Sequence, residues 1–436
     1  MITEETTVEN KLADLLKFDL EVENEYLREL RRDALRFFVA KGLPTRKDEE
    51  WKYSDTRRTF KYIANPSTAG YTEKGLEHGF AKYAIPQLDC YTVVLINGHF
   101  AASHAKLAGL PKGALICGLD EAFTKYPEHI EDYYARQSTH AENAFTDLNT
   151  AAATSGLFVF LEEGVKLDKP LHILQLFNGH KESFAYPRNL FVVSDEAALS
   201  VIETQHHFGA SDGVNIVAVT EITVMDDASM HYYLLEESEN SALVQATYAD
   251  IGRKAHFDTN TVTLNSAWVR NDLEISLNDE YSETHLNGLY LATGENHIDN
   301  HTMVDHRLPH CNSNQLYKGV LNGKSSGVFN GKIFVQRDAQ KTNAYQSSKN
   351  ILLSEDAVVN TKPQLEIFAD DVKCSHGTTT GHLDEESLFY LRARGIGEHK
   401  ARILLLTAYA QEVLEKIQIE AFRDFLVHKI EHQLPR

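Results

Sequence analysis

The middle of the chain, from about residue 157 to residue 374, consists of short runs in which apolar and polar residues alternate. An alternation with period two is typical of β-strands, because successive side chains of a strand point to opposite faces of the sheet. These runs are rich in Val, Ile, Thr and aromatic residues, which favour strands. Long amphipathic helices are missing between the runs, and this excludes a doubly wound α/β sheet.

A weak internal repeat marks the second half of this strand region. Selected positions recur at a step of about 15 residues, and two steps give a coil of about 30 residues. They are Asn271, Asn287, Thr302, Tyr317, Gly331, Gln346, Thr361 and His376. Such a coil fits a two-sheet solenoid, or parallel β-helix, in which stacked coils bury each other's apolar side chains. An antiparallel sandwich has similar strand spacing, but clear two-residue hairpin turns are missing, so the solenoid is preferred.

Helical patterns flank the strands on both sides. Apolar residues recur at three- and four-residue steps from Leu12 to Phe38, and Gly42 and Pro44 are placed to end that helix. A second helix is predicted over 141–156, and a strand over 91–96 is followed by the turn signal Asn97-Gly98. The chain is therefore divided into an N-terminal helical and mixed region (1–156), a β-helix core (157–380) and a C-terminal helical domain (381–436).

Three helices are predicted in the C-terminal domain, over 385–394, 400–417 and 421–432. Asp384 is a suitable N-cap for the first of them, and Gly395 is placed to end it. The second helix has too many apolar positions for an exposed helix. We therefore expect it to cover the end of the solenoid or to bind a partner.

Composition excludes several classes of protein. The 43 basic and 63 acidic residues give a formal net charge of −20, which argues against nucleic-acid binding because phosphate is bound by Lys and Arg. No run approaches the roughly 20 apolar residues that cross a membrane. The acidic N-terminus lacks the apolar stretch of a secretory signal. Four scattered cysteines predict a reducing, cytoplasmic location.

The common catalytic motifs are also missing. Gly323-Lys324-Ser325 resembles the end of a phosphate-binding loop, but Lys318 occupies the position where that loop needs its first glycine. No serine nucleophile elbow, His-Glu-x-x-His motif or Cys-x-x-Cys pair is present. The acidic pairs Asp226-Asp227 and Asp370-Asp371 leave a carbohydrate-active β-helix enzyme as an alternative, although such residues are common in turns. A purely structural solenoid is a further alternative.

Cys374 and His376 form a candidate metal-binding pair. If Cys374-Ser375-His376 lies on a strand, the thiol and the imidazole project from the same face, a combination that suits iron–sulfur species, zinc or copper. From the residues alone we favour the alternative, a buried small cysteine and a hydrogen-bonded turn histidine. A second concentration contains His285, His297, His301, His306, His310 and Cys311. Its spacing matches no ligand pattern, so we expect structural or surface roles.

Six long segments, in the order of the chain, carry a family resemblance. They are residues 42–53, 327–333, 339–346, 363–367, 369–377 and 388–396. Together they resemble the SufB/SufD family of iron–sulfur cluster assembly proteins. The resemblance implies a right-handed parallel β-helix with helical flanking regions. It also implies a non-catalytic scaffold subunit that pairs with SufB and with the ATPase SufC, while a carrier of the SufE or SufU type brings sulfur.

The resemblance also implies roles for particular residues. His376 falls on the family histidine that is implicated in cluster formation or iron entry at the SufB–SufD interface, and Cys374 is a weaker candidate beside it. The helices after residue 383 correspond to the SufC-binding region. The residues of its first part are Leu388, Phe389, Leu391, Arg392, Arg394, Gly395 and Ile396.

The resemblance is closer to the SufD branch than to the SufB branch. The SufB branch carries an essential cysteine in the segment that matches residues 352–361, where this chain has Ala357 and no cysteine. The chain alone is therefore expected not to assemble a cluster efficiently, and a transient cluster or iron is expected at its interface with SufB. A homodimer in the absence of SufB and flavin binding by the complex are open alternatives.

Overall fold

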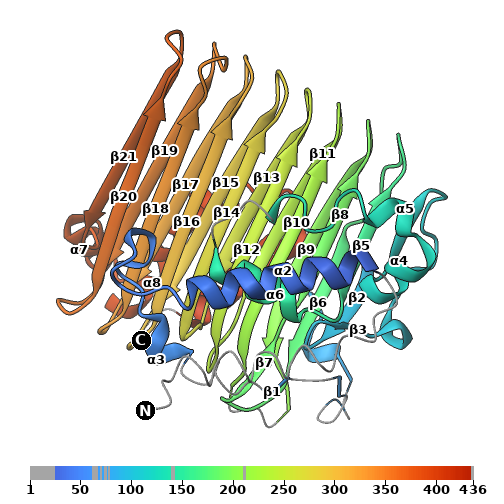
Figure 1. The fold of residues 1–436 in the computed structure, drawn as a ribbon. Helices are drawn as coiled ribbons and strands as arrows, with labels where there is room; N and C mark the ends of the chain where they lie inside the picture. Colours follow the sequence, from blue (N-terminus) through green and yellow to red (C-terminus); the bar gives the residue numbers. More distant parts are fainter. Residues whose placement is uncertain are drawn as a thin grey trace, which may run out of the picture.

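Two long sheets face each other along the molecule (Figure 1). The computed structural model describes residues 25–60, 67–68, 71–72, 76, 79–138, 143–209 and 213–433. The first part of the predicted N-terminal helix, around Leu12, lies outside these ranges. We call the two sheets sheet A and sheet B.

Sheet A has the order β20-β18-β16-β14-β12-β10-β8-β5-β4. Its strands are β4 (Ala114–Gly118), β5 (Gly156–Leu161), β8 (Arg188–Val193), β10 (Asn215–Val224), β12 (Ala242–Ile251), β14 (Trp268–Leu277), β16 (His297–His306), β18 (Ser326–Val335) and β20 (Val358–Ile367). The short strands β1 (Ser67–Thr68) and β7 (Ser183–Ala185) pair beside β10.

Sheet B has the order β21-β19-β17-β15-β13-β11-β9-β6-β2-β3. Its strands are β2 (Tyr91–Ile96), β3 (His99–Phe100), β6 (Leu171–Phe177), β9 (Ala198–His207), β11 (Ser229–Glu236), β13 (His256–Thr263), β15 (Glu283–Ala292), β17 (Asn312–Leu321), β19 (Asn343–Leu352) and β21 (Lys373–Gly381).

The chain alternates between the two sheets and forms a parallel β-helix of about eight turns. Register partners in sheet A are 26 residues apart at Ala242 and Trp268 and 32 residues apart at Ser326 and Val358. These coil lengths confirm the predicted solenoid and exclude the sandwich. Among the described strands, antiparallel pairing is confined to β2 with β3 and β4 with β5.

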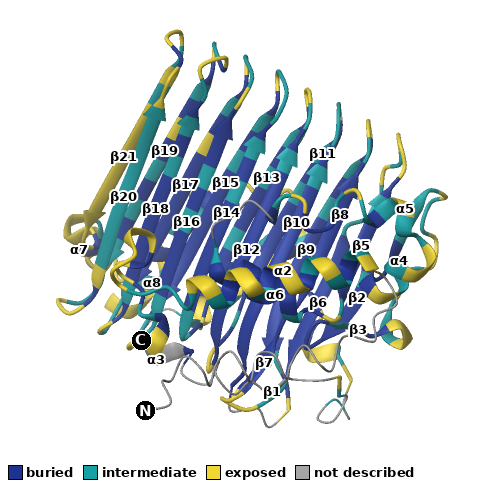
Figure 2. Ribbon diagram, in the orientation of Figure 1, coloured by how far each residue is buried: buried dark blue, intermediate teal, exposed yellow. Residues whose placement is uncertain are grey.

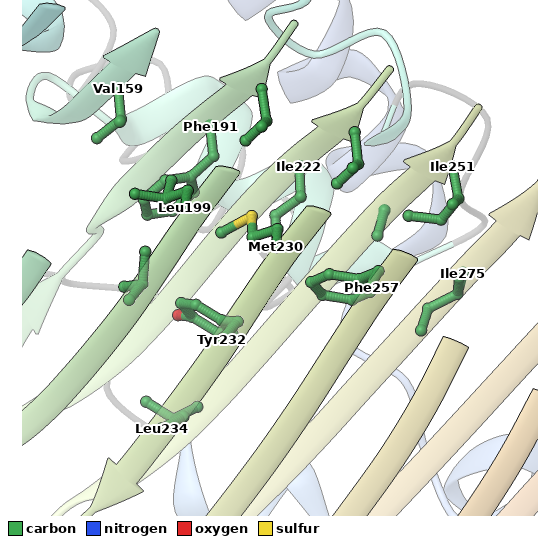
Figure 3. Packing of buried hydrophobic residues seen from close by; sticks show 14 of the residues in the cluster. Val159, Phe191, Leu199, Ile222, Met230, Tyr232, Leu234, Ile251, Phe257 and Ile275 are labelled. Atoms are coloured by element: carbon green, nitrogen blue, oxygen red, sulfur yellow. The ribbon is translucent and has the colours of Figure 1, made fainter. Parts of the chain in front are cut away.

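The core lies between the sheets, where apolar side chains from successive coils stack on one another (Figure 3). Phe191, Ile222 and Ile251 of sheet A meet Tyr232 and Phe257 of sheet B in one buried cluster. This stacking explains why no single coil needs a core of its own.

Helices cover the outer faces of both sheets. On sheet A, α2 (Glu25–Lys41) packs against α6 (Ala144–Ala152). As predicted, Gly42 ends α2, with a φ of +67°. The shorter helices are α3 (Thr56–Thr59), α4 (Leu119–Lys125) and α5 (Pro127–Ile130), together with the 3-10 turns Glu49–Trp51, Ala81–Tyr83 and Ala102–His104.

The C-terminal helices α7 (Glu385–Ala393), α8 (Glu398–Leu414) and α9 (Glu420–Gln433) confirm the three predicted helices. Val413 of α8 and Phe422 of α9 are buried in one cluster with Leu289 and Leu316 of sheet B. The expectation that these apolar residues cover an end of the solenoid is therefore wrong for α8 and α9. They cover the flank of sheet B, because the outer faces of its central strands are themselves apolar.

Candidate functional site

The last coil of the solenoid leaves its end open. Strand β20 pairs with β18 and β21 pairs with β19, and no other described strand lies along their free edges. Figure 2 shows β21 exposed along almost its whole length and β20 at an intermediate level, whereas the strands behind them are more buried. We call this region, formed by β20 and β21, the open end.

The register of β21 shows which of its side chains face the interior of the solenoid. Cys374 is paired with Ala344, and His376 is paired with Gln346. Because Ala344 and Gln346 are buried between the sheets, their register partners Cys374 and His376 also face inward, into the mouth of the open end. The structure therefore places both sequence-predicted residues on one strand and on one face, as the spacing required.

The two side chains have different environments. Cys374 is half-buried and packs against an apolar cluster that includes Ile333, Val335 and Ala344. Burial raises the pKa of the Cys374 thiol. His376 is exposed. In this arrangement the cysteine resembles a small apolar residue, and the imidazole of His376 is the more accessible of the two side chains.

A row of polar side chains lies beneath His376 in the interior. Gln346 donates a hydrogen bond from Nε2 to Oε1 of Gln315 (3.2 Å), and Thr302 donates to the same oxygen (2.7 Å). The Oε1 atom of Gln346 is buried without a hydrogen-bond partner among the described residues. Gly331 allows this packing, since a Cβ atom there would lie 2.2 Å from Gln346 Nε2. The mouth is thus polar below His376 and apolar around Cys374.

The predicted partner-binding segment lies on α7, which starts four residues after β21 ends. Leu388 is buried and anchors the helix, whereas Phe389 is 72% exposed and Tyr390 is also exposed. Leu391 and Ile396 are half-buried. The Arg392 guanidinium lies 3.4 Å from the Glu398 carboxylate, and the Arg394 guanidinium lies over the Tyr390 ring. Gly395 follows the helix with a φ of +86°. A shallow groove runs along α7 and is lined by residues that include Phe389 and Leu391. The exposed apolar side chains of this segment are therefore on α7, whereas the surplus apolar residues predicted for the second C-terminal helix pack against sheet B as part of α8.

The residues between His285 and Cys311 do not form one site. His297 contacts Ser326, His301 contacts Asp299, His306 contacts Ser313, His310 stacks on Tyr281, and Cys311 contacts Ser282. Only His285 belongs to a group of three potential ligand atoms within 4.8 Å of one another among the described residues. The contacts of the other members fit the structural roles predicted for them, and these roles stay a prediction.

Sequence reasoning missed the group to which His285 belongs. His231, Asp258 and His285 are direct register partners on β11, β13 and β15. They are separated by steps of 27 residues, the length of a coil in this part of the chain. A search for ligand residues at that period would have found them.

Ala357, at the position where the resemblance places the cysteine of the SufB branch, is buried immediately before β20. The other free thiols are far from the mouth in sequence, and burial raises the pKa values of Cys90, Cys117 and Cys311 as well. None of these groups supplies a reactive thiol at the open end. Among the described helices, none is both long and apolar enough to cross a membrane.

Comparison with known proteins agrees with this architecture. The family model "SUF system FeS cluster assembly, SufBD core domain" matches residues 176–409, and the model "SufBD protein N-terminal region" matches residues 16–173. An iron–sulfur cluster assembly SufBD family protein of Synechocystis is 30% identical, covering 92% of this chain and 90% of the relative. The iron–sulfur cluster assembly protein SufD of Escherichia coli is 29% identical, with 92% of each chain covered. The chloroplastic protein ABCI7 of Arabidopsis thaliana is 28% identical, covering 91% and 84%. The chain belongs to the SufB/SufD family of iron–sulfur cluster assembly proteins.

Proposed function

We propose that this chain is a non-catalytic scaffold subunit of the SufD type, which pairs with SufB through the open end and handles iron or a nascent cluster there. One observation carries the proposal. The last coil presents two strands, each with one free edge, around a mouth that contains His376, whereas the first coil is closed by the chain itself.

The free edges of β20 and β21 are the basis for the proposed SufB interface. An edge strand exposes a row of N–H and C=O groups, and a long exposed edge pairs readily with another chain. Strand β20 has 10 residues and β21 has 9, so both edges are long. Exposed Val358 and Ile367 lie at the two ends of β20 and add apolar surface. A second copy of this chain would use the same edges when SufB is absent.

His376 is the proposed iron ligand. A neutral imidazole binds iron, so we expect cluster formation to fall when this side chain is protonated or replaced. Cys374 is the weaker candidate, because its thiol is half-buried and its pKa is raised. Since this chain has Ala357 where the SufB branch has its cysteine, the sulfur acceptor belongs to SufB, and a carrier of the SufE or SufU type supplies the sulfur. The cluster is cargo that leaves the scaffold.

The ATPase SufC is proposed to bind α7. Exposed Phe389 and Tyr390 offer an apolar surface there, flanked by Arg392 and Arg394. Because residues 382–384 alone connect β21 to α7, movement of α7 during ATP hydrolysis would be transmitted to the strand that holds His376. The interface would then open to iron and persulfide.

The carbohydrate-enzyme alternative gains no support from the acidic pairs. Asp226 lies 3.3 Å and Asp227 3.9 Å from the Arg253 guanidinium, and Asp371 pairs with Lys341. These pairs belong to turns between strands, where carboxylates stabilise the turn.

The test compares His376→Ala with Cys374→Ser in the complex reconstituted with SufB and SufC. We expect His376→Ala to abolish most anaerobic cluster formation, followed by visible absorption, while the purified complex keeps its composition. Cys374→Ser should retain most of the activity, since its thiol packs against apolar residues. Unchanged cluster formation in His376→Ala would contradict the ligand role. Failure of the wild-type chain to bind SufB would contradict the scaffold role itself.

A further inference from the structure

On the outer face of sheet B, three histidines and two carboxylates meet near the starts of three adjacent strands. His231, Asp258 and His285 occupy one row across β11, β13 and β15. His256 and Glu283 occupy the row two residues earlier on β13 and β15. Because adjacent strands are about 4.8 Å apart, an in-register row places side chains of successive coils side by side.

The strand alternation confirms that this group faces away from the core. Phe257, between His256 and Asp258, is buried inside the solenoid, as are Met230 and Thr284 beside the other members. The five side chains of the group are all partly exposed. They are therefore accessible from solvent and are held by strands whose opposite face is fixed in the core.

Asp258 is the centre of the group. Its Oδ1 atom lies 2.9 Å from His256 Nε2 and 2.7 Å from His285 Nδ1, and its Oδ2 atom lies 3.3 Å from His231 Nδ1. Glu283 Oε1 lies 3.4 Å from His285 Nε2. Two sets of ligand atoms, from His231, His256 and Asp258 and from His256, Glu283 and His285, each lie within 4.8 Å of one another.

We propose that this group binds one divalent first-row transition-metal ion of the Fe²⁺ or Zn²⁺ class. Metal–ligand bonds of about 2.0–2.2 Å place neighbouring ligand atoms about 3–3.5 Å apart, close to the separations around Asp258. Two imidazoles and a carboxylate are a ligand set typical of Fe²⁺ sites, and imidazole suits Zn²⁺ equally. Hard cations such as Mg²⁺ prefer all-oxygen sites, and this group is mainly imidazole.

The group is separate from the open end. Strands β17 and β19 lie between β15 and β21, and His376 faces inward whereas the group faces outward. Its own neighbourhood is the turn between α8 and α9. The His231 ring stacks parallel to Tyr233 at 6.3 Å, and the Tyr233 hydroxyl accepts a hydrogen bond from the backbone N–H of Gln418 (3.3 Å). A bound ion would therefore lie beside the C-terminal helices.

The experiment is a calorimetric titration of the full, untagged chain with Fe²⁺ under anaerobic conditions, with Zn²⁺ and with Mg²⁺. A histidine tag is avoided because it binds the same ions. We expect one equivalent of Fe²⁺ or Zn²⁺ and no Mg²⁺. Asp258→Asn and His256→Gln should each weaken binding by about 100-fold, and the visible spectrum of Co²⁺ added instead should lose its bands.

The double variant His376→Ala/Cys374→Ser is the matched control, and we expect it to bind the ion as the wild type does. This control separates the site from the role proposed for the open end. His256→Gln keeps the proposal testable if Asp258→Asn unfolds, which far-UV circular dichroism would show. Unchanged affinity in a folded Asp258→Asn or His256→Gln chain would overturn the proposal. Loss of binding in the double variant alone would also overturn it, because the ion would then occupy the open end.

Discussion

The two ends of the solenoid are built from the same kind of coil, but the described residues cover the interior differently at each end. At the first end, the segment between β2 and β4 folds across the interior, where Phe100, Leu107 and Leu110 pack on the core. Thr92 and Lys106 exchange backbone hydrogen bonds there (3.1 and 2.7 Å). At the open end, no described segment crosses the mouth. The first end completes the fold, and the exposed coil at the other end supports the proposal that a partner binds there.

The largest effect on the free energy of unfolding should come from replacing one leucine by alanine at each end of the solenoid. Leu95 on β2 is fully buried, so Leu95→Ala should lower the free energy of unfolding by about 2–5 kcal/mol. Leu365 on β20 is half-buried, so Leu365→Ala should lower it by only about 1 kcal/mol in the isolated chain. Urea unfolding of both variants measures the difference. Equal losses would mean that the open end is as well packed as the first end.

A charge in the mouth should weaken partner binding without unfolding the chain. Thr378 faces inward, as the register partner of buried Ser348, whereas Ser375 is the partner of exposed Tyr345. Thr378→Lys should weaken association with SufB by about 100-fold, roughly 2.7 kcal/mol, because an unpaired charge would be buried. Ser375→Lys, on the same strand but the outer face, is the control. Surface plasmon resonance compares them, and equal effects would argue against a buried mouth.

The pH dependence of stability tests whether water enters the interior of the solenoid through the open end. His306 is buried in the interior on β16, and burial lowers the pKa of its imidazole to about 3. An unfolded histidine titrates near pH 6.5, so between pH 6.5 and 3 the unfolded chain binds one proton more than the folded chain. The contribution of His306 to the free energy of unfolding should therefore fall by about 1.4 kcal/mol per pH unit as the pH drops below 6.5.

Two variants isolate this contribution in urea unfolding at pH 7, 6 and 5. In His306→Gln, the free energy of unfolding should no longer show the pH dependence that one proton contributes. Ser313→Ala should keep it, because it removes only the hydroxyl partner 2.9 Å from the ring. An unchanged slope in His306→Gln would show that water from the mouth reaches this part of the interior.

The sequence predicted the architecture well because its signals are local and repeated. Alternating apolar runs fix the strands, and the repeat from Asn271 to His376 fixes the coil length. Turn and cap residues were equally informative. Asn97 and Gly98 both have positive φ between β2 and β3, and Asp384 caps α7.

The packing partners of each element could not be predicted in the same way. The sequence of α8 alone does not show whether its apolar face packs on the end of the solenoid or on the outer face of a sheet. That depends on the outward-facing residues of strands such as β15 and β17. The His231, Asp258 and His285 row was missed for the same reason, since its members are distant in sequence. The preferred interpretation of His376 as a turn residue was wrong, since it lies within β21. Its shared face with Cys374 could be predicted, because residues two apart on one strand point to the same side whatever the global fold.

Hydrogen–deuterium exchange of β20 and β21, with and without SufB, tests the central claim most directly. The isolated chain is measured at a dilution where light scattering shows a monomer. We expect fast exchange in Lys373–Gly381 and Val358–Ile367 of the monomer, strong protection after SufB binds, and no change at β3 and β4. Protection at β3 and β4, with β20 and β21 unchanged, would contradict the assignment of the open end as the partner interface.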